Sequence, residues 1–114
     1  MTDGVLLAIS TFPDAATADR IAEQLVTARC AACANIITAP VRSIYHWGGK
    51  LERGEETMVF FKTTTARFAE FQAKLKELHP YDVPEIVAFD TGRGLPAYLQ
   101  WVHDSTTTGS PNEP

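Results

Sequence analysis

The sequence predicts an α+β domain in which two helices cover one face of a single antiparallel sheet. Apolar runs of strand-like composition and two amphipathic stretches follow one another in the order strand, helix, strand, strand, helix, strand. This order is the split β-α-β-β-α-β arrangement called ferredoxin-like. The chain has 114 residues, which fits one domain with one core. We therefore expect residues 1–104 to form a single domain.

The first two elements are a strand and a helix. Residues 5–9 are a short apolar run that precedes Pro13, as is typical of a buried strand. Asp14 is a suitable N-cap for the helix that follows. Apolar residues then recur at helical spacing, with charged residues elsewhere on the wheel, so we expect the helix to extend to about residue 29.

The middle of the chain predicts a long hairpin. Residues 33–47 are rich in β-branched and aromatic side chains, and Pro40 among them indicates an edge position or a bulge. Gly48 and Gly49 form a turn signal. Residues 57–63, Thr-Met-Val-Phe-Phe-Lys-Thr, predict the returning strand.

The last third predicts a helix, a strand and a short final helix. The threonines at 63–65 offer hydroxyl groups to cap the second helix, which ends at His79 because Pro80 follows. Residues 84–89 predict the last strand, and Pro96 can open a short helix over 97–103. Residues 105–114 contain no apolar side chain and are expected to form a disordered tail.

Composition and charge exclude several functional classes. The formal net charge is −4, and no basic cluster lies on any expected face, so we predict no nucleic-acid partner. No apolar run approaches the roughly 18 residues of a membrane span, so no membrane partner is expected. The chain starts without a basic stretch followed by an apolar run, and it has only two cysteines. Both features favour a cytoplasmic location.

The central strands predict an oligomer. An antiparallel sheet with one face in water normally alternates apolar and polar residues. Here residues 58–61 are four consecutive apolar residues, and Ile36 and Ile37 are also adjacent, so both faces carry large apolar groups. Soluble monomers rarely expose such a patch. The alternative is that the C-terminal segment folds over the second face.

Several short segments of the chain together resemble one family. The segment 31–37, Ala-Ala-Cys-Ala-Asn-Ile-Ile, and the segment 78–86, Leu-His-Pro-Tyr-Asp-Val-Pro-Glu-Ile, are the longest of them. In order along the chain, the segments are 31–37, 43–47 with Gly49 and Lys50, Lys62 with Thr63, 78–86 and 98–102. They are similar to the successive motifs of the CutA divalent-cation tolerance family, over about residues 5–103.

This resemblance implies a ferredoxin-like protomer in a cytoplasmic homotrimer, with a cleft at each subunit interface. It implies a role in tolerance to divalent cations, with copper or another divalent metal as the bound ion and no organic cofactor. It supplies no reaction, and we expect no enzyme, because the residues provide no nucleophile with an adjacent base. The alternative is a sensor or scaffold, like the trimeric PII-type signalling proteins, that binds a small anionic ligand or a partner protein at the cleft. Acid-base chemistry by Lys62, His79, Tyr81 and Glu85 is the third alternative.

The two cysteines have unequal roles in this interpretation. Cys30 and Cys33 have the spacing of a redox pair, but they follow a helix, whose negative dipole end disfavours a thiolate. Cys33 falls on the Ala-Ala-Cys-x-Asn-Ile position of the family, whereas relatives usually carry an aliphatic residue at the position of Cys30. We therefore expect Cys30 to be a buried apolar residue, and Cys33 to be either a core residue or a cleft thiol able to hold a soft metal ion.

The candidate site residues come from several segments. Cys33 and His79 are the candidate metal ligands, because thiolate and imidazole suit copper or zinc. A rigid loop bracketed by Pro80 and Pro84 follows His79 and contains a phenol and two carboxylates. An ion pair between Lys62 and Glu85, or packing of the aromatic residues, is the alternative to a site. The candidate residues of the ligand-binding cleft are Lys62, Tyr81, Glu85, Trp47 and Tyr98.

Overall fold

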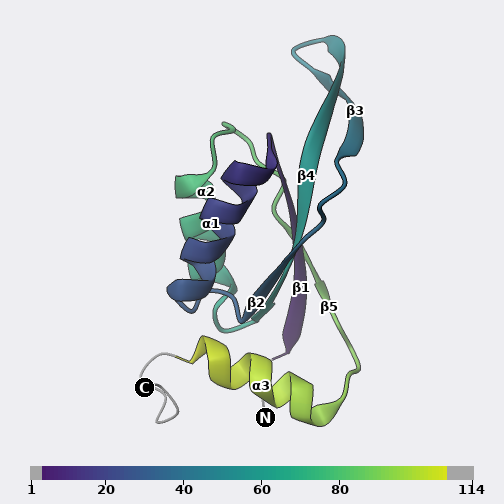
Figure 1. Cartoon of the computed structure of the whole chain (residues 1–114). Helices are drawn as coiled ribbons and strands as arrows, with labels where there is room; N and C mark the ends of the chain where they lie inside the picture. The colour runs from purple at the N-terminus through teal and green to yellow at the C-terminus, as the bar shows by residue number, and fades with distance from the viewer. Residues whose placement is uncertain (1–3, 108–114) are drawn as a thin grey trace.

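The computed structural model describes residues 4–107. A five-stranded antiparallel sheet has the strand order β2-β4-β1-β5, and β3 extends it by pairing with the first half of β4. Helices α1 and α2 lie on one face of the sheet, and α3 lies across one end (Figure 1). The elements are β1 (Val5–Phe12), α1 (Ala15–Thr27), β2 (Cys33–Ile36), β3 (Val41–Trp47), β4 (Lys50–Thr64), α2 (Phe68–Leu78), β5 (Val87–Asp90) and α3 (Pro96–Thr106). The ferredoxin-like prediction is confirmed.

The strand β4 differs most from the expectation, because it has 15 residues and begins at Lys50 rather than at Thr57. Its first half is paired with β3 in a hairpin that projects from the body of the molecule (Figure 1). Most side chains at 50–55 are exposed, so they carry charge instead of the apolar pattern by which a strand is recognised. Gly48 and Gly49 form the turn, and both have positive φ, as glycine allows.

The core lies between the sheet and the helices α1 and α2. Phe61 from β4 meets Phe71 from α2 edge to face, with ring centroids 5.1 Å apart. Alternate residues of β1 and β4 point into this core, as the pleat requires. The fully buried large apolar side chains of this core are Phe12, Ile21, Leu25, Val59, Phe61, Phe71 and Leu75.

The opposite face of the sheet is apolar and incompletely covered. Met58 and Phe60 alternate with the core residues of β4 and are half-buried on this face. Phe89 of β5 is 55% exposed there. Helix α3 covers only one end, where Val102 packs with Val5 and Ala32. The C-terminal helix therefore leaves much of the face bare within one protomer.

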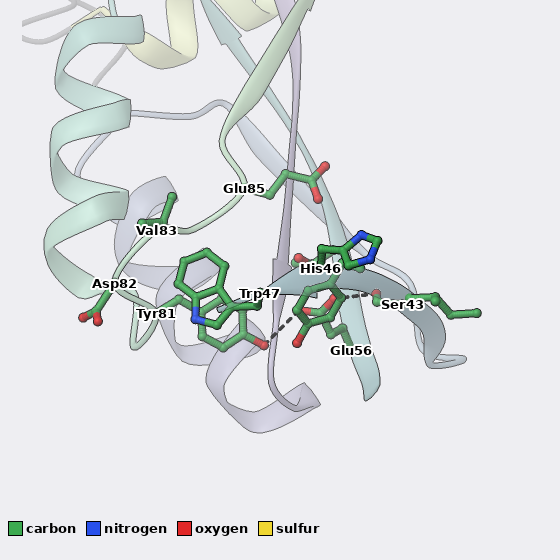
Figure 2. Close-up of a pocket in the computed structure, with 11 residues that line it drawn as sticks. Ser43, His46, Trp47, Glu56, Tyr81, Asp82, Val83 and Glu85 are labelled. Atoms are coloured by element: carbon green, nitrogen blue, oxygen red, sulfur yellow. Dashed lines mark hydrogen bonds between the residues drawn. The ribbon is translucent and has the colours of Figure 1, made fainter. Parts of the chain in front are cut away.

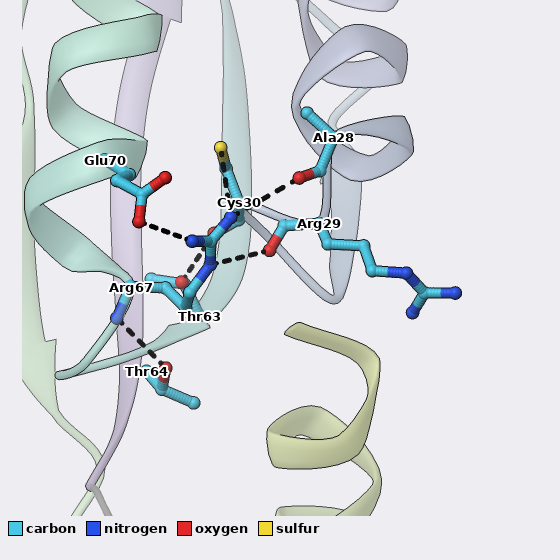
Figure 3. A network of polar contacts seen from close by, with 7 residues as sticks. All are labelled: Ala28, Arg29, Cys30, Thr63, Thr64, Arg67 and Glu70. Carbon is cyan, nitrogen blue, oxygen red and sulfur yellow. Dashed lines mark hydrogen bonds and ion pairs between the residues drawn. The ribbon is translucent and has the colours of Figure 1, made fainter. Parts of the chain in front are cut away.

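One arginine joins the end of α1 to the start of α2 (Figure 3). The guanidinium of Arg67 donates from Nε to the Arg29 carbonyl at 3.2 Å and from Nη2 to the Ala28 carbonyl at 3.4 Å, and its Nη1 lies 2.6 Å from the Glu70 carboxylate. Arg29 has φ of 61°, the left-handed conformation that often ends a helix. The unpaired carbonyls of the last turn are thus partly satisfied by a cation, which also complements the helix dipole.

Among residues 4–107, none of the helices has the length and apolar character needed to cross a membrane.

The last helix is longer than expected. Helix α3 extends to Thr106, so the expected tail cannot begin at residue 105. Thr106 is buried, and its hydroxyl donates to the carbonyls of Val102 and His103. The buried hydroxyl of Thr106 is therefore satisfied within the helix itself. Residues 108–114 of the expected tail lie outside the described part of the chain.

Candidate functional site

A pocket of about 710 Å³ lies where the β3–β4 hairpin meets the loop after α2 (Figure 2). Strand β3 contributes one wall, the loop after α2 contributes another, and Thr11 and Glu56 join them. Three aromatic side chains, three carboxylates and one histidine are among its lining residues. The lining residues are Thr11, Ser43, Ile44, Tyr45, His46, Trp47, Glu56, Tyr81, Asp82, Val83 and Glu85.

The carboxylate of Glu56 accepts two hydrogen bonds from other residues that line the pocket. Its Oε1 accepts from the Ser43 hydroxyl at 2.5 Å, and its Oε2 accepts from the Tyr81 hydroxyl at 2.9 Å (Figure 2). Burial, together with the hydrogen bond to Glu56 and its charge, raises the pKa of Tyr81. Tyr81 is therefore a proton donor to Glu56 and stays neutral at physiological pH.

His79 contacts the backbone of the pocket residue Tyr81 and is itself buried, with 6% of its surface exposed. Its Nδ1 accepts from the Tyr81 backbone N–H at 3.1 Å, so Nε2 carries the proton and donates to the Thr11 carbonyl at 2.8 Å. The ring also stacks on Phe12, with centroids 4.8 Å apart. Both ring nitrogens are thus occupied, which leaves neither with a free lone pair for a metal ion.

The expected cleft residues are divided between two places. Trp47, Tyr81 and Glu85 line the pocket. Lys62 does not, because it lies six positions beyond Glu56 on β4, roughly 20 Å away at strand spacing. The Lys62 amine instead donates to the Asn35 side chain, so the expected contact with Glu85 is replaced by one with Asn35.

The second place is a cluster on the open face of the sheet, formed by Cys33, Asn35, Lys62 and Tyr98. The Cys33 thiol lies 3.7 Å from Oδ1 of Asn35, the oxygen that also accepts from Lys62. Burial and the adjacent Cys33 thiol raise the pKa of Tyr98. We call these four residues the Cys33 cluster.

The two expected metal ligands are not brought together within one protomer. Cys33 lies opposite Lys62 on β4, and Lys62 lies opposite Leu7 on β1. His79 contacts β1 at Thr11, four positions after Leu7. Leu7 and Thr11 are roughly 13 Å apart at strand spacing. Within residues 4–107, no three His, Cys, Asp or Glu side chains are grouped closely enough to hold a metal ion. Within the described protomer, the ring of His79 contacts the backbone of Thr11 and Tyr81 and not Cys33.

The structure confirms that Cys30 is a buried apolar residue. It is 3% exposed and belongs to the core cluster between the sheet and the helices. Burial raises the pKa of the Cys30 thiol, which opposes the thiolate form that redox chemistry needs. Cys33 is half-buried, and both cysteines are free thiols.

Stability should fall in mild acid because of His79. Burial lowers the pKa of His79 below 6.5 and outweighs the Thr11 carbonyl and the Glu56 charge, which act in the opposite direction. The unfolded chain then binds this proton more tightly, so the contribution to stability is complete above pH 6.5 and is lost as pH falls from 6.5 toward the folded-state pKa.

Urea unfolding between about pH 8 and pH 5 measures this effect. We expect His79→Gln to be less stable than the parent at neutral pH and to show a flatter pH dependence. His46→Gln, at an exposed position, should retain the parental slope. An unchanged slope in His79→Gln would contradict the assignment.

The polar or aromatic residues that could not be placed at the two sites from the sequence include Ser43, Tyr45, Asn35 and Glu56. Glu56 ends a charged run, 52–56, that resembles an ordinary solvated stretch. Its partner Tyr81 is 25 positions away, so only the fold brings the two together. Asn35 lies within the same motif as Cys33. This proximity in sequence is the one feature that could have indicated that Asn35 belongs to the site.

The fold and these two places define a class: a small ferredoxin-like α+β domain with an aromatic, acidic pocket and a half-buried thiol on an open sheet face. Residues 6–105 match the family model described as CutA1 divalent ion tolerance protein. The chain therefore belongs to the CutA1 family. The family description names tolerance to divalent ions and no reaction.

Two curated relatives match this chain over nearly their whole length. The divalent-cation tolerance protein CutA of Thermus thermophilus is 42% identical over 96 residues, which are 84% of this chain and 92% of the relative. The protein of the same name from Pyrococcus horikoshii is 35% identical over 90% of this chain and 98% of the relative.

Solved structures show the same fold. The crystal structure of CutA1 from Oryza sativa superposes with a TM-score of 0.89 at 30% identity and covers 95% of this chain and 98% of that one. CutA from Xylella fastidiosa gives 0.87 at 36% identity, with 91% and 99% covered. A CutA structure from Archaeoglobus fulgidus, described as periplasmic, gives 0.86 at 34% identity, with 90% and 99% covered.

Proposed function

We propose that this protein acts in the response to divalent cations as a homotrimer that binds copper or another divalent metal ion at the Cys33 cluster. The carrying observation is the Cys33 thiol, which is half-buried on the open face of the sheet beside Asn35. A thiolate is a soft ligand that suits copper. The family description of divalent ion tolerance supports the same role.

The metal site proposed at the Cys33 cluster needs ligands from a second copy. The described protomer groups no three His, Cys, Asp or Glu side chains around a common point. Cys33 lies on the same open face as Phe60 and Phe89, whose apolar surface favours association with another subunit. Assembly would therefore both cover this face and bring further donors to the thiol.

Native mass spectrometry with copper added tests the metal site. We expect bound copper per assembly, and we expect Cys33→Ala to lose most of it because the soft ligand is removed. Cys30→Ala is the matched control, since its buried thiol should leave the copper count unchanged. Equal copper binding by Cys33→Ala and the parent would remove the proposed site.

The thiols also support a cytoplasmic location for the protein. Both cysteines are free in the structure, and a reducing compartment keeps thiols in that form. The structure from Archaeoglobus fulgidus is described as that of a periplasmic protein, so the location of this chain needs its own test. Cell fractionation of a tagged chain checks the proposal, and recovery in the periplasmic fraction would contradict it.

The alternative function, a PII-like sensor of a small anionic ligand at the pocket, has less support. Three carboxylates line the pocket, and its described lining contains no lysine or arginine. Lys62, the cation expected at this cleft, belongs to the Cys33 cluster instead. An anion would meet like charge at this place.

A further inference from the structure

The charge of the pocket selects for cations. The acidic residues Glu56, Asp82 and Glu85 are among its lining residues, and His46 is the only nitrogen base among the described ones. A cleft lined by one sign of charge concentrates ions of the opposite sign. The Glu56 carboxylate is held in place by Ser43 and Tyr81, so its negative charge has a fixed position at the pocket wall.

The aromatic walls favour an organic cation over a metal ion. Tyr45 and Trp47 are large aromatic residues that are 47% and 56% exposed, and Tyr81 joins them at the pocket. The face of an aromatic ring attracts an ammonium group, and tryptophan does so best. Divalent metal ions instead need several converging ligands, and the described residues offer no grouping of three.

The remaining hydrogen-bonding capacity of Glu56 also fits an ammonium ion. An ionised carboxylate has about four acceptor positions. Ser43 and Tyr81 occupy one on each oxygen. The free positions can accept an N–H donor or lie against a quaternary ammonium group. The volume of about 710 Å³ is within the range of small-molecule sites.

We propose that this pocket binds a small organic ammonium cation, with Trp47 and Tyr45 against its charged group and Glu56 as its counter-ion. The proposal is independent of copper binding at the Cys33 cluster, because Lys62, Asn35 and Cys33 are not part of the pocket lining. The proposed ligand is a cation, whereas a PII-like sensor is expected to bind an anion.

Fluorescence can test the proposal directly because the chain has two tryptophans. The Trp101→Phe variant leaves Trp47 as the only one, so its emission reports on the pocket. We expect tetramethylammonium and butylammonium to produce a saturable change at constant ionic strength. The uncharged compounds tert-butanol and 1-butanol, which are similar in size, should bind at least about tenfold more weakly.

Variants of the same reporter chain locate the binding. Glu56→Gln should weaken tetramethylammonium binding by about tenfold, because the charge is removed while an acceptor for Tyr81 is retained. Glu55→Gln, the exposed neighbour outside the pocket lining, is the matched control and should bind normally. Cys33→Ala should also bind normally. Circular dichroism confirms that each variant folds.

Three results would each overturn the proposal. The first is no saturable response to either ammonium ion. The second is equal affinity for the ammonium ions and the uncharged alcohols, which would show an apolar site. The third is an equal or stronger response to Mg²⁺ at the same ionic strength, which would show a general acidic surface. Loss of copper binding in Cys33→Ala with ammonium binding retained would support two separate sites.

Discussion

Phe61→Ala is expected to lower the free energy of unfolding by about 3–5 kcal/mol, the usual cost of removing a phenylalanine from a packed core. Phe61 has no exposed surface and meets Phe71 edge to face. The substitution deletes the ring and leaves a cavity between β4 and α2 that rigid neighbours cannot fill. A small domain has about 5–15 kcal/mol of stability in total, so the loss is large.

Equilibrium urea unfolding at one fixed protomer concentration measures this loss. Phe68→Ala is the matched control, because Phe68 packs on the same Phe71 ring at 5.9 Å but is only partly buried. We expect a clearly smaller loss for Phe68→Ala. If the two variants lost equal stability, Phe61 would not be the centre of the core.

Phe89→Asp is expected to convert the assembly into a 12.5 kDa species. Phe89 is 55% exposed on the open face, where it extends the apolar surface of Met58 and Phe60. In the proposed homotrimer this face is covered by another subunit. A buried, unpaired carboxylate would then cost several kcal/mol at every copy of the interface.

Analytical ultracentrifugation distinguishes the outcomes. The parent should sediment as three copies of the chain, and Ala69→Asp, on the exposed side of α2, should do the same. A parental sample that contains only the 12.5 kDa species would contradict the proposed trimer. A trimeric Phe89→Asp would show that a different face makes the contact.

The parts of the fold that bury apolar residues could be predicted from the sequence. Asp14 was expected to cap α1, and its carboxylate accepts from the Thr17 backbone N–H at 2.8 Å. Pro80 was expected to end α2, which stops at Leu78. The first half of β4 was missed because pairing with β3, and not burial, makes it a strand. Hydrogen bonding of an exposed hairpin leaves little apolar pattern in the sequence.

The candidate site was predicted only in part because its two places depend on strand register. Trp47 and Tyr81 were expected together and both line the pocket. Lys62 was expected with them, but the register between β2 and β4 places Lys62 opposite Cys33. His79 has the chemistry of a ligand, and only the structure shows that Thr11 and the Tyr81 N–H already occupy its ring.

Two basic side chains near the two ends of β1, Arg67 and His79, respond differently to acid. Near its start, Arg67 joins α1 to α2, and a guanidinium keeps its charge at any pH a cell encounters. Near its end, His79 holds the loop of Tyr81 only while it is neutral. We therefore expect acid to weaken the two ends unequally. Protonation of His79 removes the acceptor of the Tyr81 N–H and so loosens the pocket loop and the base of the hairpin first. The contacts of Arg67 between α1 and α2 are retained.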